Sequence, residues 1–150
     1  MASLTRTVAL VGMMGAGKSS IGRRLAARLD VPFRDGERRV ILRVLKEPPH
    51  VLATGGGALL NADTRSRIAE QTFSIWLRAP IELLLSRIER RDTRPLLRNG
   101  HPRETLERLL HEREPLYAEA KLVIDAQDGP HHLAVERIVK VLISEGLLQT

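Results

Sequence analysis

The sequence predicts an α/β protein in which a parallel β-sheet is covered by helices on both faces. Short apolar runs rich in β-branched residues, typical of buried parallel strands, alternate along the chain with segments of helical periodicity. A glycine-rich stretch, "GMMGAGKSS", also follows the first of these runs and leads into the first helical segment. The 150 residues contain no repeat, low-complexity tract or linker, so we expect a single domain over 1–150.

The expected elements follow one another without long gaps. The run "TVALVG" at 7–12 predicts the first strand, and the spacing of Ile21, Leu25 and Leu29 predicts a helix over 18–29. A second strand is expected to end at Phe33. Further strands are predicted at 50–54, 72–77 and 121–125, and further helices at 36–46, 61–70 (opened by an Asn or Asp cap), 80–90, 103–120 and 130–145. The polar stretch at 91–103, with its prolines and glycine, predicts a loop.

Composition narrows the function classes. The chain lacks cysteine, which excludes disulfides and thiolate metal sites. The net charge is +6 and most of the basic residues are arginine, which suits phosphate and carboxylate ligands; the scarcity of aromatic residues argues against a nucleic-acid-binding module. The five histidines show no metal-ligand spacing and are interpreted as structural or solvent-exposed, and Trp76 as a core residue. No apolar run approaches the roughly 20 residues of a membrane span. We expect a cytoplasmic protein.

The glycine-rich stretch matches the pattern G-x-x-x-x-G-K-[ST] at Gly12, Gly17, Lys18 and Ser19. Glycines let several backbone N–H groups point at the same phosphate oxygens, while the lysine reaches the β- and γ-phosphates and the hydroxyl can ligate magnesium. The helix that begins there adds the positive end of its dipole. The stretch therefore predicts a site for ATP and Mg²⁺, formed by Gly15, Ala16, Gly17, Lys18, Ser19 and Ser20.

Three further stretches point to a second ligand. "ATGGGALL" at 53–60 places three consecutive glycines directly after a strand, at the sheet edge where ligands bind in open α/β folds. Close approach of the backbone to a ligand explains this better than a flexible turn does. "RPLL" at 94–97 and "EREPLY" at 112–117 are weak patterns when each is taken alone.

In combination, "GMMGAGKSS", "FRDGE", "ATGGG", "RPLL" and "EREPLY", in this order, resemble the shikimate kinase family over nearly the whole chain. The resemblance implies phosphorylation of the 3-hydroxyl of shikimate by ATP, in the pathway to chorismate and the aromatic amino acids. It also implies the P-loop NTPase fold in its nucleoside monophosphate kinase-like form. This is a three-layer α/β/α fold with a five-stranded parallel sheet in the order 2-3-1-4-5 and a lid, here around 91–103.

For the acceptor side, the resemblance assigns Arg34 and Arg113 to the carboxylate of shikimate. Planar guanidinium groups suit that task, because two N–H groups can hold both carboxylate oxygens. Glu37 matches a family glutamate that positions the first of these arginines, and Gly56 and Gly57 would offer backbone N–H groups to the substrate.

For the nucleotide side, the resemblance assigns Lys18 and the lid residue Arg94 to catalysis, where both would stabilise the phosphoryl group in transfer. Arg87 matches an arginine that packs on adenine, and 125–130 lies where the family has its adenine loop. The expected ligands are ATP, Mg²⁺ and shikimate. We expect a monomer that binds neither nucleic acid nor membranes.

One segment departs from the family pattern. The family has an "F-x-D-x-D" stretch after the first helix, followed by about two dozen residues that lead to an "FR" motif, whereas here Phe33 stands in both motifs at once. Asp35 lies in the later motif, so we do not expect it to replace the missing aspartates. Either these residues belong to the protein and are omitted between Phe33 and Arg34, or the chain truly lacks them. Omission is favoured, because every other motif is intact.

Omission would leave Phe33 and Arg34 well separated, with Phe33 ending a strand and Arg34 beginning a helix that points its side chain into the acceptor pocket. Two rival functions stay open. One is another small-metabolite kinase of this fold, such as a gluconate kinase, although the three glycines and "EREPLY" argue against it. The other is a nucleotide-binding protein that is inactive because it lacks the acceptor-side aspartates.

Overall fold

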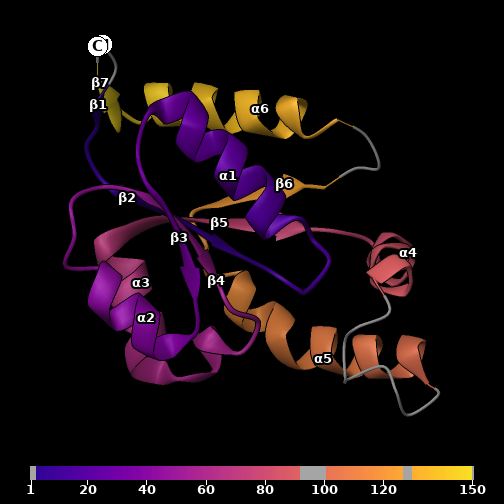
Figure 1. Ribbon diagram of the computed structural model, residues 1–150. Helices are drawn as coiled ribbons and strands as arrows, with labels where there is room; N and C mark the ends of the chain where they lie inside the picture. The colour runs from indigo at the N-terminus through magenta and orange to yellow at the C-terminus, as the bar shows by residue number, and fades with distance from the viewer. Residues whose placement is uncertain (1–2, 92–100, 127–129, 150) are drawn as a thin grey trace.

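The computed structural model describes residues 3–91, 101–126 and 130–149 (Figure 1). Its centre is a five-stranded, wholly parallel sheet. The strands are β2 (Thr7–Val11), β3 (Phe33–Gly36), β4 (Val51–Thr54), β5 (Thr72–Arg78) and β6 (Leu122–Asp125), and they lie in the order β3-β4-β2-β5-β6. Numbered along the chain, this order is 2-3-1-4-5, which confirms the expected topology.

Helices cover the sheet on both sides. The main helices are α1 (Lys18–Leu29), α2 (Arg38–Val44), α3 (Ala62–Gln71), α4 (Ile81–Arg91), α5 (Pro102–Tyr117) and α6 (His131–Ser144), and a 3₁₀ turn, η1, spans Ala58–Leu60. Figure 1 shows α1 and α6 together on one face, and α2, α3 and α5 on the other. The three-layer α/β/α architecture is therefore confirmed, and most predicted helix boundaries hold to within a few residues.

Burial explains why these segments adopt these structures. All five residues of β2 are buried, as a strand between two neighbours and two helical layers must be. The expected helix cap is confirmed at Asn61, whose side-chain oxygen accepts a hydrogen bond from the backbone N–H of Thr64 at 3.0 Å. Trp76 lies in β5 and is buried, as its interpretation as a core residue requires.

The junction at Phe33 and Arg34 differs from the prediction. Both residues belong to β3, none of the described peptide bonds is cis, and β3 pairs with β4 in an unbroken register from Phe33–Val51 to Gly36–Thr54. The expected separation of the two residues is therefore wrong, and so is the expectation that Arg34 begins a helix. The helix predicted at 36–46 starts later, at Arg38, because the strand continues through Gly36.

Side chains alternate across β3, and this fixes which side of the sheet each residue faces. The ring of Phe33 packs against Gly22 of α1, where an added Cβ would lie 2.5 Å from the ring, and the guanidinium of Arg23 lies 4.8 Å from its centre. Asp35 shares the face of Phe33, whereas Arg34 faces the opposite layer. The two residues therefore have different surroundings although they are neighbours in sequence.

A small two-stranded antiparallel sheet joins the ends of the chain, a feature that the sequence did not predict. It pairs β1 (Ser3–Leu4) with β7 (Leu148–Gln149). Strands of two residues carry no periodic signal, so their pairing depends on tertiary contacts alone. Among the described residues, no helix is both long enough and apolar enough to cross a membrane.

Candidate active site

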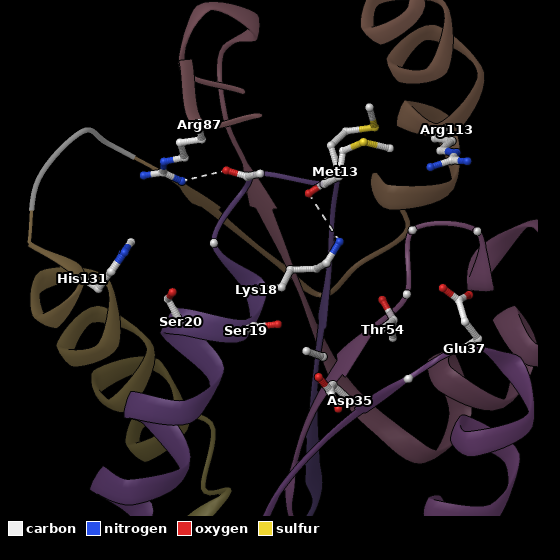
Figure 2. A pocket seen from close by; sticks show the side chains of 18 residues that line it. Met13, Lys18, Ser19, Ser20, Asp35, Glu37, Thr54, Arg87, Arg113 and His131 are labelled. Atoms are coloured by element: carbon white, nitrogen blue, oxygen red, sulfur yellow. Dashed lines mark hydrogen bonds between the residues drawn. The ribbon is translucent and has the colours of Figure 1, made fainter. Parts of the chain in front are cut away.

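A cavity of about 700 Å³ opens at the carboxyl ends of the parallel strands (Figure 2). We call one end the phosphate half, lined by Gly15, Gly17, Lys18, Ser19, Ser20, Arg87 and His131. We call the other end the acceptor half, lined by Asp35, Glu37, Gly55, Gly56, Gly57 and Arg113. The phosphate half comes from the β2–α1 loop with α4 and α6, and the acceptor half from the ends of β3 and β4 with α5.

The β2–α1 loop holds its shape through its own hydrogen bonds. Lys18 donates from Nζ to the carbonyl of Gly12 and, at 3.4 Å, to that of Met13, so its ammonium lies across the loop (Figure 2). Gly17 precedes α1 with a φ of +101°, in the left-handed region that favours glycine. The N-terminus of α1, with its uncompensated N–H groups, therefore faces the cavity beside a fixed cation.

The structure brings most of the predicted nucleotide-binding residues together. Of the six residues expected from the loop, all but Ala16, which is fully buried, line the phosphate half. Arg87 reaches the same loop from α4 and donates from Nη1 to the carbonyl of Gly15 at 3.0 Å. The predicted lid residue Arg94 lies outside the described residues, as do 127–129 of the expected adenine loop.

His131 is a cavity residue that sequence reasoning missed, since it was interpreted as structural or solvent-exposed. It stands at the start of α6, and its Cε1 lies 3.6 Å from the position of a Cβ added at Gly17. The Nη1 of Arg87 lies 3.4 Å from the same position. Burial, with Arg24 and Arg87 nearby, holds the pKa of His131 below its ordinary value. The signal available in the sequence was its place at the start of a helix that follows the last parallel strand.

In the acceptor half, the three glycines form a turn held at both ends. The N–H of Gly55 donates to the carbonyl of Gly36 at 2.8 Å, which continues the pairing of β4 with β3. The hydroxyl of Tyr117 donates to the carbonyl of Gly56 at 3.4 Å. Tyr117 is buried against Trp76, with ring centres 5.9 Å apart, and burial raises the pKa of its hydroxyl. Hydrogen bonds to β3 and to α5 thus hold the turn at Gly55 and at Gly56.

Arg113 and Tyr117 lie four residues apart on α5, so both side chains face the glycine turn. Nη1 of Arg113 lies 3.1 Å from the position of a Cβ added at Gly56. This nitrogen is buried and has no hydrogen-bond partner among the described residues. A buried guanidinium nitrogen without an acceptor is costly, and an anionic ligand in the acceptor half would supply one. The spacing in "EREPLY" could have identified Tyr117 as the partner of the turn.

The structure does not bring Arg34 to this cavity. Its Nε donates to Oε1 of Glu47 at 3.1 Å, on the far side of β3, and the two side chains are 42% and 38% exposed. By strand alternation Phe33 and Asp35 face α1 and Arg34 faces the opposite layer, and Arg34 is not among the described residues that line the cavity. The expectation that Arg34 shares the acceptor pocket with Arg113 is therefore not met.

Two carboxylates line the acceptor half instead. Asp35 leaves β3 on the side of α1, and Glu37 follows one residue after the strand, beside the glycine turn (Figure 2). Asp35 was not expected to replace the missing aspartates, because it lies in the later of the two family motifs. The structure places it at the end of the second parallel strand, where it reaches the cavity.

The parallel sheet, the phosphate-binding loop between β2 and α1, and the facing acceptor half define a P-loop kinase for a small anionic acceptor. The comparisons with known proteins agree. The family model described as shikimate kinase matches residues 30–143. The chain belongs to the shikimate kinase family.

Individual relatives are similar over most of their length. The shikimate kinase of Caulobacter vibrioides is 47% identical over 91% of this chain and 82% of its own. That of Paramagnetospirillum magneticum is 45% identical over 93% and 85%. The solved structure of the shikimate kinase from Acinetobacter baumannii in complex with shikimate has a TM-score of 0.87 at 30% identity, covering 95% of each chain. A gluconokinase from Sinorhizobium meliloti, at 15% identity and a TM-score of 0.62, shares the fold alone.

The alignment with the Caulobacter protein also bears on chain length. It runs over 164 positions but includes only 91% of this 150-residue chain, so more than two dozen positions of that relative have no counterpart here. Membership of the family establishes an ATP-dependent kinase that phosphorylates shikimate. Which residues of this shorter chain perform the reaction is a separate question.

Proposed function

We propose that this enzyme transfers the γ-phosphoryl group of ATP to the 3-hydroxyl of shikimate through the residues of the two cavity halves. The products are shikimate 3-phosphate and ADP, on the route to chorismate. The main support is the buried Nη1 of Arg113, which has no hydrogen-bond partner within the part of the chain that the structure describes and shares one cavity with the phosphate-binding loop. The acceptor carboxylate would supply the missing hydrogen-bond acceptor and leave the hydroxyls turned toward the phosphates.

On the nucleotide side, the N-terminus of α1 and the backbone of the β2–α1 loop bind the phosphates. Lys18 exchanges its loop carbonyls for phosphate oxygens and stabilises the negative charge on the phosphoryl group in transfer. Arg87 keeps its hydrogen bond to Gly15 and lies beside the nucleotide. For Arg94, the lid role implied by the resemblance stays a prediction.

The residues present also fit a magnesium ion. The Ser19 hydroxyl at the start of α1 and the Asp35 carboxylate on the same side of the sheet are oxygen ligands, the type that Mg²⁺ prefers. No group of three or more acidic or histidine side chains within the described residues could hold a metal, which suits an ion that takes its other ligands from phosphates and water. When bound, Mg²⁺ would neutralise charge on the β- and γ-phosphates.

On the acceptor side, Arg113 holds the carboxylate, and the backbone N–H groups of Gly56 and Gly57 border the ring of the substrate. Tyr117 keeps the turn in place through its hydrogen bond to Gly56. We also propose, as an expectation carried from the sequence, that the enzyme acts as a cytoplasmic monomer on small molecules and not on nucleic acid or membranes.

The test is acceptor-dependent release of ADP by the purified 150-residue protein, with the product identified by ³¹P NMR. We expect turnover with shikimate and Mg²⁺-ATP, and loss of turnover with the methyl ester of shikimate, which lacks the carboxylate charge. Turnover with gluconate in place of shikimate would favour the rival kinase. Binding of ATP without any transfer to shikimate would show that the shortened chain is inactive.

A further inference from the structure

Transfer of a phosphoryl group to a hydroxyl releases a proton, which a group close to that hydroxyl must accept. Among the described residues that line the cavity, only Asp35 and Glu37 carry carboxylates. His131 can also accept a proton, but it lies in the phosphate half beside Gly17. Within the described part of the chain, the candidates for the proton acceptor in the acceptor half are therefore the two acidic residues that line it, Asp35 and Glu37.

Of these two carboxylates, that of Glu37 lies against the glycine turn of the acceptor half. It occupies the N-cap position of α2, yet its side chain makes no capping hydrogen bond. Its carboxylate lies instead against the glycine turn, where a Cβ added at Gly55 would be 2.2 Å from Oε1 and 2.3 Å from Cδ. The carboxylate of Glu37 thus occupies the space that a side chain at position 55 would need, and a side chain there would displace it.

The carboxylate of Glu37 and the guanidinium of Arg113 lie over consecutive residues of the turn, Gly55 and Gly56 (Figure 2). No salt bridge joins them, and within the described part of the chain neither oxygen of Glu37 has a hydrogen-bond or ion-pair partner. Because the carboxylate of Glu37 and the guanidinium of Arg113 do not pair with each other, both can bind a ligand in the acceptor half. A ligand with a carboxylate at one end and hydroxyls at the other matches the pair.

Asp35 has different surroundings. It shares the strand face of Phe33, which packs on α1, so it is directed to the side of Ser19 and the phosphates. Glu37 stands two residues further along, past the end of the strand and beside the turn. Both carboxylates line the acceptor half, but Asp35 lies on the side of α1 and Glu37 lies beside the glycine turn.

We infer that the carboxylate of Glu37 accepts the proton of the acceptor hydroxyl, an inference that rests on the proposed function because it concerns the same acceptor. The hydroxyl oxygen forms a bond to the γ-phosphorus while the bond from that phosphorus to the β–γ bridging oxygen breaks, and its electron pair leaves on ADP. The O–H bond of the acceptor breaks and its proton passes to Glu37. Atoms and charge balance without any further reactant.

The experiment compares Glu37→Gln with Asp35→Asn and with the control Glu136→Gln, which makes the same change in an exposed residue of α6. Steady-state rates with shikimate and ATP are measured alongside nucleotide affinity by calorimetry. We expect Glu37→Gln to lower kcat by at least about 10²-fold, the usual size of general-base catalysis, with KM for shikimate and affinity for ATP changed only slightly. Glu136→Gln should match the native enzyme.

Gly55→Ala provides a second variant, which keeps the carboxylate but forces it from its place. Its kcat should fall as well, because the displaced group is the end of a flexible side chain and the fold can adjust around it. A rise in KM at unchanged kcat for Glu37→Gln would overturn the inference and leave Glu37 a binding role. So would a loss of kcat confined to Asp35→Asn. If the native enzyme itself shows no shikimate-dependent release of ADP, the proposed function has failed instead.

Discussion

The two halves of the cavity are built in opposite ways. The phosphate half consists mainly of one continuous stretch, 12–20. The ammonium of Lys18 is hydrogen-bonded to carbonyls of the same stretch, and Gly17 lies directly before the helix that the stretch begins. The acceptor half is assembled from the ends of β3 and β4 and from α5, and it contains a buried nitrogen that no described residue hydrogen-bonds. A phosphate site can therefore be formed by local backbone geometry, whereas the acceptor site depends on tertiary placement and is completed by its ligand.

Lys18→Ala should have the largest effect, because it breaks the phosphate half at the point where charge develops. Removal of one preorganised donor typically costs on the order of 10² in kcat, and we expect at least that loss here. Shikimate-dependent release of ADP provides the measurement. Lys140→Ala, in an exposed residue of α6, is the matched control. Unchanged turnover in Lys18→Ala would contradict the assignment of the phosphate half.

Arg113→Ala should affect the acceptor half alone. Loss of a charge-assisted pair with a carboxylate costs roughly 1.5–3 kcal/mol, or about 10- to 150-fold in affinity. Calorimetric titration with shikimate and with ATP separates the two halves, because only the shikimate affinity should fall. Arg108→Ala, an exposed arginine on the same helix, controls for the loss of positive charge. Equal losses for both ligands would show that the halves are not independent.

The difference between the halves also explains how much could be predicted from the sequence. The phosphate-binding loop, the strand order and most helices were predicted correctly, because a local motif and apolar periodicity specify them. Arg113, Gly56 and Gly57 were placed in the cavity by their resemblance to the family, and they line it. His131 was missed, because its contact with Gly17 joins residues more than a hundred positions apart.

The segment after Phe33 was the least predictable part. Phe33 fits two family motifs, and "FRDGE" as the later motif predicted Arg34 in the acceptor pocket and gave Asp35 no role there. The structure does the reverse, because pairing with β4 continues through Gly36 and side chains alternate along the strand. Once the register with β4 is known, the inward position of Asp35 follows from alternation alone. The sequence contains no signal for that register.

His131 tests the electrostatics of the phosphate half, with a smaller expected effect. In the folded protein the pKa of its imidazole lies below the ordinary value of about 6.5. The unfolded chain then binds more protons than the folded one as the pH falls below about 6.5, so His131 makes the native state less stable toward acid. Bound nucleotide phosphates should raise this pKa, because they favour the charged imidazole.

NMR titration of the imidazole, with and without ADP, measures both effects. When the pH is lowered, the thermal stability of His131→Gln should fall less than that of the native enzyme. The stability of His132→Gln, a change in an exposed neighbour, should fall as much as that of the native enzyme. A pKa at or above the ordinary value in the free enzyme would mean that the imidazole does not lie in the phosphate half. No change on addition of ADP would mean that it lies too far from the phosphates to contact them.

Arg34→Ala should have the smallest effect, and it tests whether Arg34 takes part in binding the acceptor. Arg34 pairs with Glu47 on the face of β3 away from the cavity, with both side chains more than a third exposed. Exposed pairs of this kind contribute about 0.2–1 kcal/mol, so we expect a slight loss of thermal stability and a shikimate affinity within about twofold of the native value. The same calorimetric titration as for Arg113→Ala makes the comparison direct, and Glu47→Ala should reproduce the loss of stability. A fall in shikimate affinity as large as that of Arg113→Ala would contradict the structure. It would require the Arg34 side chain to leave Glu47 and turn into the acceptor half when the acceptor binds.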